Sequence, residues 1–226
     1  MNLEKQYNNL YQESISKIRN DQYQTDELID STDDNRFGIT LLIRPDKKVK
    51  SEIQKFLNQV RLIEPEQYYY PSSDIHITVM SIISCYDGFE LPQISINDYV
   101  KVIQESINEF SAFDIEFRGL TASPSCIMVK GFFKEDTLNQ IRENLRVNFG
   151  KSDLQQSIDK RYSIKTAHST VIRLRKELTN KEDFLRTIED NKDRYFGTFK
   201  VDNLELVYND WYQRNKFVEQ LHNFKI

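Results

Sequence analysis

Cysteine, glycine and long apolar runs are scarce in this sequence, and each shortage excludes a class of protein. The 226 residues include two cysteines, Cys85 and Cys126, which lie far apart without a CxxC pair or a Cys/His cluster, so free thiols are expected. The six glycines form no Gly-rich loop that ends in Lys-Ser/Thr, which argues against a P-loop kinase. No stretch approaches the roughly 20 consecutive apolar residues of a membrane span, and no membrane partner is expected.

An excess of positive charge is also missing, because 35 Asp and Glu residues outnumber 31 Lys and Arg residues. The formal net charge is −4 and the isoelectric point is near 5.5, so the chain as a whole lacks the positive field that holds a long polyanion. A nucleic-acid partner should therefore be small or held locally, and long duplex nucleic acid is not expected. Because the N-terminus has no apolar signal core, we expect a cytoplasmic protein. We also expect a monomer.

The length and composition suit one large domain or two tightly joined lobes. Residues 1–36 are polar, with apolar residues at helical spacing followed by an acidic stretch, and predict a helical extension and a linker. A helix that packs on the back of the domain is favoured there over a partner-binding segment or a substrate lid. Residues 37–226 are predicted to form the two-lobed domain.

Strand and helix patterns are mixed throughout residues 37–226. Runs rich in β-branched and aromatic residues predict strands, and apolar residues at intervals of three and four predict helices. Hairpins alongside strand-helix-strand units indicate an α+β fold with antiparallel sheets. The expected strands are 37–44, 75–83, 113–120, 126–133 and 168–174, the helices are 48–63, 97–110, 137–149 and 181–190, and a final hairpin pairs 197–208 with 216–224.

Two of the expected strands carry the same four-residue motif near their start. His76-Ile-Thr-Val79 and His168-Ser-Thr-Val171 lie 92 residues apart in a chain with three histidines, so the repeat is hardly accidental. Strand side chains alternate between faces, so each histidine shares a face with the threonine two residues later. Each strand therefore offers one imidazole and one hydroxyl side by side.

This pairing suits the cleavage of a phosphodiester without a metal ion. One proton must leave the attacking oxygen and another must reach the departing oxygen, and imidazole is able to do both because it titrates near pH 6.5. His76 and His168 are therefore the predicted catalytic acid and base, with neither role assigned to either residue. Thr78 and Thr170 are predicted to bind the substrate, because their hydroxyls can donate hydrogen bonds to phosphate oxygens.

Paired His-x-Thr motifs on strands in the two halves of such a domain resemble the two-histidine (2H) phosphoesterase superfamily, in particular its branch of 2′-5′ RNA ligase-like proteins and RNA 2′,3′-cyclic phosphodiesterases. The resemblance spans residues 37–226, from the opening Arg36-Phe37 to the closing hairpin. It implies a bilobal α+β fold with pseudo-twofold symmetry, antiparallel sheets lining a central cleft and helices outside. It also implies hydrolysis of a 2′,3′-cyclic phosphate or a 2′-5′ linkage of a nucleotide or short RNA, with no metal and no cofactor.

Basic residues near His168 are candidates for a supporting role. Arg161 and Lys165, in the segment before it, are candidate contacts at the rim of the site. Arg173 and Arg175 should project from the face opposite His168 because strand side chains alternate, and they are not expected in the site.

Other aromatic and histidine residues have simpler explanations. Tyr68-Tyr-Tyr70 could stack on a base, but core packing or an exposed loop is the favoured interpretation. His222 has no threonine two residues later, and we expect a structural or exposed side chain there.

Rival functions are less well supported. A zinc or dimetal hydrolase needs converging ligands, and the sequence has no His-x-His, His-x-x-Glu or His-Glu-x-x-His pattern. Neither cysteine has a setting that suggests a nucleophile. The serious alternative is a non-catalytic module on the same fold that binds a nucleotide or an RNA end.

Overall fold

Two antiparallel sheets frame the structure, a computed structural model that describes residues 3–161 and 163–226. The four-stranded sheet has the order β3-β1-β8-β9, with β1 Arg36–Ile43, β3 Ile77–Asp87, β8 Asn203–Asp210 and β9 Glu219–Lys225. The five-stranded sheet has the order β2-β6-β5-β4-β7, with β2 Tyr68–Tyr69, β4 Phe113–Ser123, β5 Cys126–Phe132, β6 Ser169–Arg173 and β7 Tyr195–Val201. The pairing and the interspersed helices confirm the predicted α+β class.

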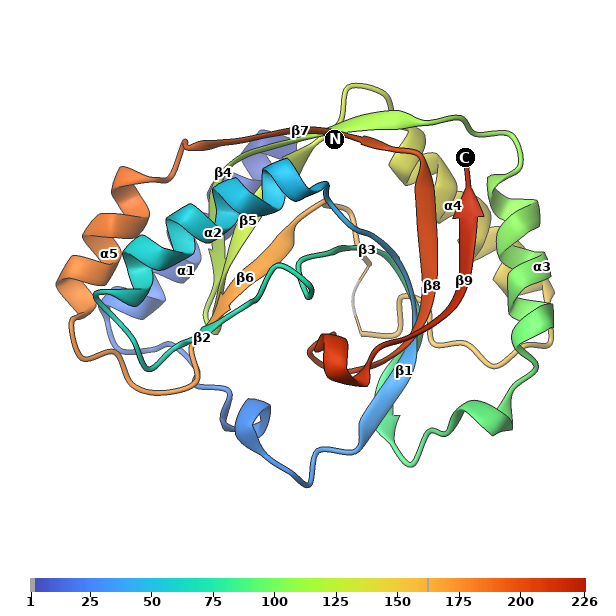
Figure 1. Cartoon of the computed structure of the whole chain (residues 1–226), viewed down its shortest axis with the longest axis horizontal. Helices are drawn as coiled ribbons and strands as arrows, with labels where there is room; N and C mark the ends of the chain where they lie inside the picture. Colours follow the sequence, from blue (N-terminus) through green and yellow to red (C-terminus); the bar gives the residue numbers. More distant parts are fainter. Residues whose placement is uncertain (1–2, 162) are drawn as a thin grey trace.

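Helices cover the outer faces of both sheets (Figure 1). The five-stranded sheet packs against α1 Leu3–Arg19 and α2 Lys47–Arg61, and α5 Lys181–Asp190 contacts both of these helices. The four-stranded sheet packs against α3 Ile96–Ile107 and α4 Thr137–Lys151. Each helix buries one apolar stripe; in α2 this stripe is Val49, Ile53, Phe56, Leu57 and Val60.

The chain passes repeatedly between the two lobes. After β1 in the four-stranded sheet it forms α2 and β2 on the other lobe, and it then returns for β3 and α3. Similarly, α4 covers the four-stranded sheet although the strands on either side of it, β5 and β6, belong to the five-stranded sheet. Each lobe is therefore built from several separate segments of the chain. The strands that follow His76 and His168 thereby fall in different sheets.

The N-terminal helix is part of the core. Tyr7 and Ile18 on α1 are fully buried, and the helix packs along β4. These contacts agree with the expectation of a helix on the back of the domain. Whether residues 1–36 form an extension distinct from a domain at 37–226 stays a prediction.

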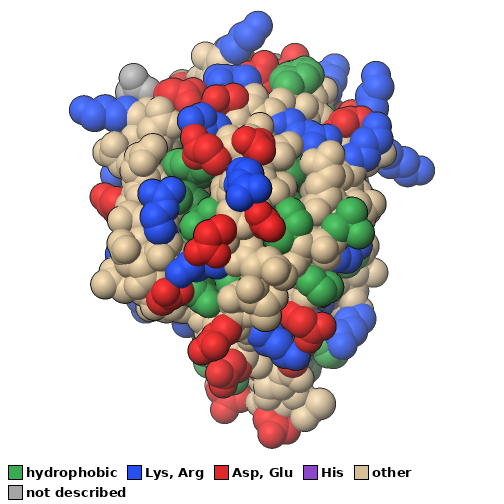
Figure 2. Space-filling model, turned by 90° about the vertical axis from the view of Figure 1, so that its left-hand side faces the viewer, with side chains coloured by type: hydrophobic (Ala, Val, Ile, Leu, Met, Phe, Trp, Pro, Cys, Tyr) green, Lys and Arg blue, Asp and Glu red, His purple; other side chains and the backbone are tan. Residues whose placement is uncertain are grey.

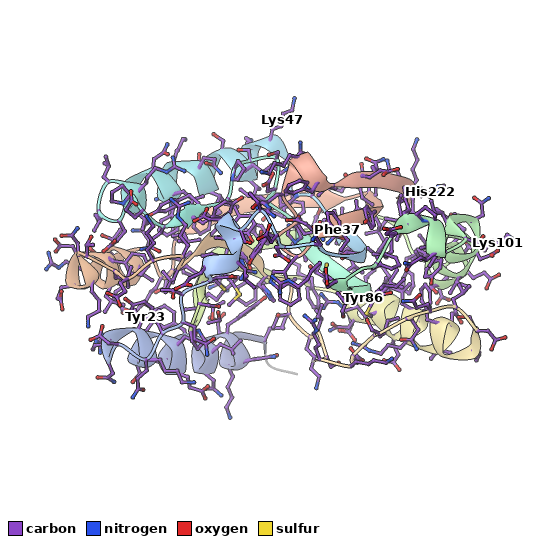
Figure 3. All side chains as sticks on the ribbon, turned by 90° about the horizontal axis from the view of Figure 1, so that it is seen from below. Tyr23, Phe37, Lys47, Tyr86, Lys101 and His222 are labelled. Carbon is purple, nitrogen blue, oxygen red and sulfur yellow. The ribbon has the colours of Figure 1, made fainter. Side chains whose placement is uncertain are left out.

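Residues 20–35, which we call the strap, run from one lobe to the other. The strap holds the five-stranded side through Asp26, whose backbone N–H donates to the carbonyl of Leu174 at 2.8 Å. It holds the other side through the carbonyl of Ile29, in the short 3₁₀ helix η1 Glu27–Asp30, which accepts from Arg214 at 2.9 Å. Figure 3 shows Tyr23 and Phe37, near its two ends, on the two lobes. The predicted linker therefore bridges the lobes.

One predicted strand is wrong. Residues 197–208 were expected to run as a single strand, but they contribute to β7 and β8, which belong to different sheets. The chain leaves one sheet and enters the other at Asp202, and β8 then pairs with β9 as the predicted hairpin. The helix expected to end before Gly150 continues to Lys151. The other elements agree with the prediction to within four residues at each end.

Charges of both signs are interspersed on the face shown in Figure 2, with acidic side chains gathered at its narrow lower end. Figure 1 places the strap at that end, and its sequence carries Asp21, Asp26, Glu27, Asp30, Asp33 and Asp34. Among the residues that the structure describes, no helix is both long enough and apolar enough to cross a membrane.

Candidate active site

The two repeated motifs meet in one cavity between the sheets. His76 directly precedes β3, an edge strand of the four-stranded sheet, and His168 directly precedes β6 of the five-stranded sheet. Both imidazoles and the hydroxyl-bearing Thr78 and Thr170 line a cavity of about 180 Å³. All four side chains are half-buried. The structure thus brings together the four residues that the sequence singled out.

The ring of His76 is held by the chain just before it. Its Nδ1 lies 2.7 Å from the carbonyl oxygen of Asp74, and because a carbonyl can only accept, Nδ1 carries the proton. In the neutral ring Nε2 is then the unprotonated nitrogen. Burial lowers the pKa of His76 to about 4. The hydrogen bond to Asp74 acts in the opposite direction, and the positive charge of Arg44 lowers the pKa further.

The ring of His168 has a different partner. Its Nδ1 lies 2.7 Å from the hydroxyl oxygen of Thr166, which is able to donate or to accept. Nε2 of this ring can therefore carry a proton even in the neutral form. Burial lowers the pKa of His168 to about 4, and the charge of Arg142 adds to the shift.

A buried arginine ties the two histidine segments together. Arg142 on α4 is fully buried, and its guanidinium donates to the carbonyls of Val79 at 3.0 Å, Thr78 at 3.0 Å and Thr166 at 2.8 Å. The first two carbonyls belong to β3, and the third lies two residues before His168. One side chain therefore links the backbones that carry both imidazoles.

Tyr7, on α1, also supports the segment that leads to His168. Its hydroxyl donates to the carbonyl of Gly131 at 3.1 Å and accepts from the N–H of Ala167 at 3.0 Å. Gly131 has no room for a side chain, because a Cβ there would lie 1.9 Å from the carbonyl oxygen of Ala167. The backbone of β5 and the residue next to His168 are thus packed in direct contact.

Arg173 also lines the cavity, although the strand alternation had predicted that its side chain points away from the site. In the pairing of β5 with β6, Ile127 faces Ile172 and Met128 faces Thr170, so Val171 is an extra residue in β6. Such a bulge reverses the alternation of side chains beyond it. The expectation that Arg173 points away from the site is therefore wrong. Arg175 lies outside the cavity, as expected.

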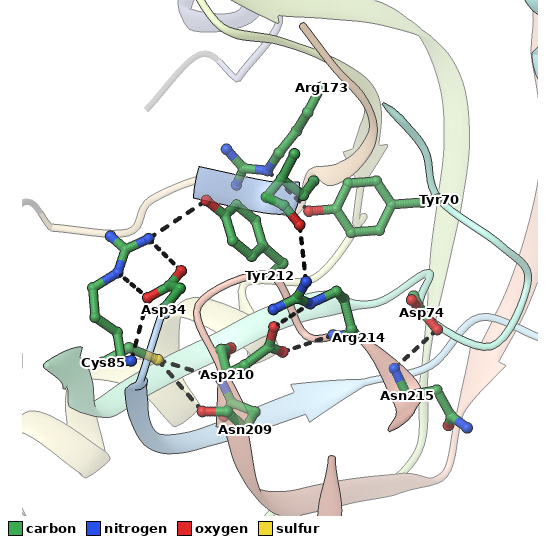
Figure 4. A network of polar contacts seen from close by, with 12 residues as sticks. Asp34, Tyr70, Asp74, Cys85, Arg173, Asn209, Asp210, Tyr212, Arg214 and Asn215 are labelled. Atoms are coloured by element: carbon green, nitrogen blue, oxygen red, sulfur yellow. Dashed lines mark hydrogen bonds and ion pairs between the residues drawn. The ribbon is translucent and has the colours of Figure 1, made fainter. Parts of the chain in front are cut away.

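Arg173 is held by residues from three parts of the chain. Its guanidinium donates to the hydroxyl of Tyr70 at 3.0 Å and to the carboxylate of Asp26 at 3.2 Å. The other carboxylate oxygen of Asp26 accepts from the hydroxyl of Tyr212 at 2.7 Å. Figure 4 shows Arg173, Tyr70 and Tyr212 converging on one side of the site. The strap therefore supplies the carboxylate that fixes this cation.

Trp211 lines another wall of the cavity. The guanidinium carbons of Arg161 and Arg36 lie 4.5 Å and 4.6 Å from the centre of its ring. Arg161 thus lines the cavity as the sequence suggested, whereas Lys165 lines a neighbouring depression instead. The indole ring is thus packed against two guanidinium groups, and Arg161 adds a positive charge to this wall of the cavity.

Solved structures share this architecture. TT0787 of Thermus thermophilus aligns at 14% identity with a TM-score of 0.59, covering 84% of this chain and 97% of that one. Escherichia coli LigT complexed with 3′-AMP aligns at 13% identity and 0.58, covering 84% and 98%. A conserved protein, ATU0111 from Agrobacterium tumefaciens str. C58, aligns at 14% identity and 0.53, covering 94% and 97%. The chain has the LigT-like fold.

At these identities the likeness establishes the fold and confirms the bilobal architecture that the sequence motif implied. Comparisons of the sequence with protein-family models and with curated proteins find no match. The roles of individual residues in this LigT-like chain therefore rest on its own geometry.

The remaining candidates contribute no obvious chemistry. Cys85 borders the cavity of the LigT-like fold, but burial raises the pKa of its thiol to about 12, which disfavours a nucleophilic thiolate. Tyr70 is buried, as favoured from the sequence, with its hydroxyl on Arg173. His222 lies on β9 with its ring centre 4.5 Å from that of Phe224, at the edge of the molecule in Figure 3.

Metal ligands do not converge in the described part of the chain. No group of three His, Cys, Asp or Glu side chains among residues 3–161 and 163–226 is arranged to hold an ion. Metal independence stays a prediction.

Proposed function

We propose that the protein is a phosphodiesterase of the 2H superfamily, in which His76 and His168 are the general base and the general acid. The observation that carries the proposal is that both His-x-Thr motifs, 92 residues apart, line one cavity. Neither sheet alone could provide both sides of a phosphorus atom. The interleaved lobes make the two imidazoles face a shared space.

The hydrogen bonds at Nδ1 support an assignment of roles. Neutral His76 has an unprotonated Nε2, which can take the proton of the attacking water. His168 then donates a proton to the leaving oxygen. The low pKa of His168 in the free protein is compatible with this role, because an anionic phosphate next to the ring favours its protonated form.

The threonines and Arg173 complete the proposed mechanism. The hydroxyls of Thr78 and Thr170 donate hydrogen bonds to the non-bridging oxygens as negative charge builds on the phosphoryl group. Arg173 contributes a positive charge at the same cavity, held in place by Asp26 and Tyr70. Removing one such donor in other enzymes costs about 10²- to 10³-fold in rate.

The substrate that we propose is a 2′,3′-cyclic phosphate or a 2′-5′ phosphodiester of a nucleotide or short RNA. The LigT-like fold supports a nucleotide, since E. coli LigT has been solved with 3′-AMP. The cavity that both histidines and both threonines line also has Arg161 and Trp211 in its wall, which can contact the rest of a nucleotide. We propose further that the protein acts as a cytoplasmic monomer without a cofactor.

Hydrolysis of a substrate panel tests the proposal. The panel contains 2′,3′-cyclic nucleotides and 2′-5′ dinucleotides in EDTA, with the intact protein, His76→Ala, His168→Ala and the control His222→Ala. We expect turnover in the intact protein and the control, and a loss of at least about 10²-fold in each of the other variants. A folded protein that binds these compounds without turnover would instead be the non-catalytic binding module.

A further inference from the structure

The cavity adjoins a second hollow on the four-stranded lobe, which we call the side groove. The side groove has a volume of about 350 Å³, and Ser84, Ser157 and Arg161 line both it and the cavity. Its own lining adds Tyr86 and Lys160, both of which are exposed. A ligand in the cavity that continues past the shared residues would therefore reach the side groove.

Two segments of the chain form the walls of the side groove, and hydrogen bonds join them. The end of β3 forms one wall, and residues 155–161 form the other. The backbone N–H of Ser157 donates to the carbonyl of Ile82 at 2.8 Å, and the hydroxyl of Ser157 accepts from the N–H of Ser84 at 2.7 Å. The side groove is thus already formed in the free protein, as binding sites for small ligands usually are.

The side groove carries positive charge that no neighbouring carboxylate neutralises. Lys160 and Arg161 line it, and no acidic side chain does so among the described residues. The Lys160 ammonium makes no hydrogen bond or ion pair with any residue that the structure describes. Arg161 donates from Nη2 to the carbonyl of Cys85 at 3.2 Å, which leaves other N–H groups of its guanidinium able to donate. A phosphate group is a suitable acceptor for both cations.

Tyr86 gives the side groove an aromatic surface. Its side chain is 39% exposed, and its ring centre lies 5.5 Å from that of Phe89. Its hydroxyl accepts from Nε2 of Gln155 at 2.8 Å. The ring is therefore held by two neighbours while much of its surface stays open to a ligand. Exposed aromatic rings next to cations are the surfaces on which single-stranded nucleic acids stack their bases.

The depression that contains Lys165 also adjoins the cavity, but it is less suited to a phosphate. Among the residues described there, the carboxylates that line it are Glu135, Asp136, Glu143 and Asp159. Its Arg146 already donates to Asp159 at 2.5 Å. Negative charge therefore surrounds the cations of that depression. Of the two hollows beside the cavity, the side groove is the one that favours an anionic ligand.

We propose that the side groove binds the next nucleotide of an RNA strand, on the 5′ side of the sugar that carries the scissile phosphate, so that an oligonucleotide is preferred over a mononucleotide. A strand that ends in a 2′,3′-cyclic phosphate continues only through the 5′ oxygen of its last sugar. The phosphate on that oxygen accepts hydrogen bonds from Lys160 and Arg161, and the base beyond it stacks on Tyr86. This inference rests on the proposed function and narrows its substrate class.

Three ligands of increasing length test the inference on the intact protein. They are adenosine 3′-monophosphate, adenosine 3′,5′-bisphosphate, which adds the second phosphate, and the dinucleotide ApAp with a 3′-terminal phosphate, which adds the second base. We expect calorimetry to show that each addition strengthens binding by about tenfold. Equal affinity for the three ligands, or no binding of the dinucleotide, overturns the proposal.

Variants locate the two contacts. Lys160→Gln and Arg161→Gln should each lose most of the gain from the second phosphate. Lys165→Gln removes the same charge beside the other depression and should keep that gain. Tyr86→Leu should lose the gain from the second base, whereas Tyr86→Phe should keep it because the ring remains. A phosphate gain that persists in both Lys160→Gln and Arg161→Gln, or that is lost equally in Lys165→Gln, overturns the proposal.

The outcomes separate this inference from the proposed function. Gains in affinity that depend on Lys160 and Tyr86, in a protein without hydrolysis, support the side groove and contradict the enzyme. Conversely, hydrolysis of 2′,3′-cyclic nucleotides that depends on His76, together with equal affinity for the three ligands, supports the phosphodiesterase and contradicts the side groove.

Discussion

Arg142 donates a hydrogen bond from Nη2 to the carbonyl oxygen of Thr166 at 2.8 Å, and the same nitrogen donates to Thr78 at 3.0 Å. Thr78 follows His76 by two residues, and Thr166 precedes His168 by two. A single buried nitrogen thus joins the two segments whose spacing sets the distance between the imidazoles. The side chain comes from α4, which carries none of the predicted site residues.

We expect Arg142→Met to lower kcat by about 10- to 100-fold, because small displacements of reacting groups have effects of this size. It should also raise the pKa of His168, since the nearby positive charge is removed. Arg142→Lys keeps the charge but not the full set of hydrogen bonds, so it should lower kcat with a smaller pKa change. NMR titration of the three histidines and steady-state rates measure these effects; destabilisation with kcat and pKa unchanged would mean that Arg142 is only structural.

The free energy of unfolding should decrease as the pH is lowered through a defined window. Both site histidines have a folded pKa of about 4, below the ordinary 6.5. Between these values the unfolded chain binds protons that the folded chain does not, so the free energy of unfolding decreases as the pH falls. Each histidine contributes at most about 1.4 kcal/mol per pH unit. The free energy of unfolding, measured in urea at several pH values, should depend less steeply on pH in the double variant His76→Gln/His168→Gln than in the intact protein. An equal pH dependence would contradict the lowered pKa values of the two histidines.

Substrate binding should shift the proton affinity of the acid. In the free site His168 is neutral at pH 7, and a bound phosphodiester anion favours its imidazolium form. The alkaline limb of the kcat profile should therefore lie at higher pH than that of kcat/KM, which reports the free enzyme. Steady-state rates between pH 4 and 9 on one substrate measure both limbs. Coincident limbs would count against His168 as the acid.

The core of the site was predictable because it follows from local rules. A histidine and a threonine two residues apart share a strand face in any sheet, so the two motifs are visible in the sequence itself. The supporting residues carry no such signal. Arg142, Tyr7 and Asp26 act through backbone carbonyls, N–H groups or distant side chains, and these partnerships arise only when helices and loops pack.

The errors have a common physical origin in departures from regular strands. Arg173 was placed on the wrong face because Val171 is an extra residue in β6, and a bulge has no reliable sequence pattern. Residues 197–208 were expected to form one strand because side-chain alternation does not reveal that the chain changes sheets at Asp202. Both the bulge at Val171 and the change of sheet at Asp202 depend on which strands pair with each segment.

Tyr7→Phe should destabilise the protein by about 1–3 kcal/mol, because the buried N–H of Ala167 and carbonyl of Gly131 lose their partner. It should lower activity as well, since Ala167 is the neighbour of His168. Tyr195→Phe, at an exposed tyrosine, should change stability by less than about 0.5 kcal/mol. Equal stability of the two variants in urea would show that the α1 contact does not support this segment.

The carboxylate of Asp26 joins the lobes, because it accepts from Arg173 on the five-stranded sheet and from Tyr212 beyond β8. Asp26→Ala should therefore loosen the strap and leave the Arg173 guanidinium without its counter-charge. Since losing one partner of a charged hydrogen bond costs about 1.5–3 kcal/mol, we expect lower stability in urea and a lower kcat/KM.

Limited proteolysis gives the most direct measure of how the strap is held. A protease that cuts within residues 20–35 should cleave Asp26→Ala faster than the intact protein, because backbone anchored at both lobes resists local opening. Asp33→Ala is the matched control, since Asp33 is an exposed carboxylate in the same segment whose side chain accepts only from the neighbouring Thr32 within the described contacts. Loss of net charge is equal in the two variants, so a difference in cleavage rate isolates the contacts of Asp26. Equal rates would show that the backbone bonds of the strap hold it without the carboxylate.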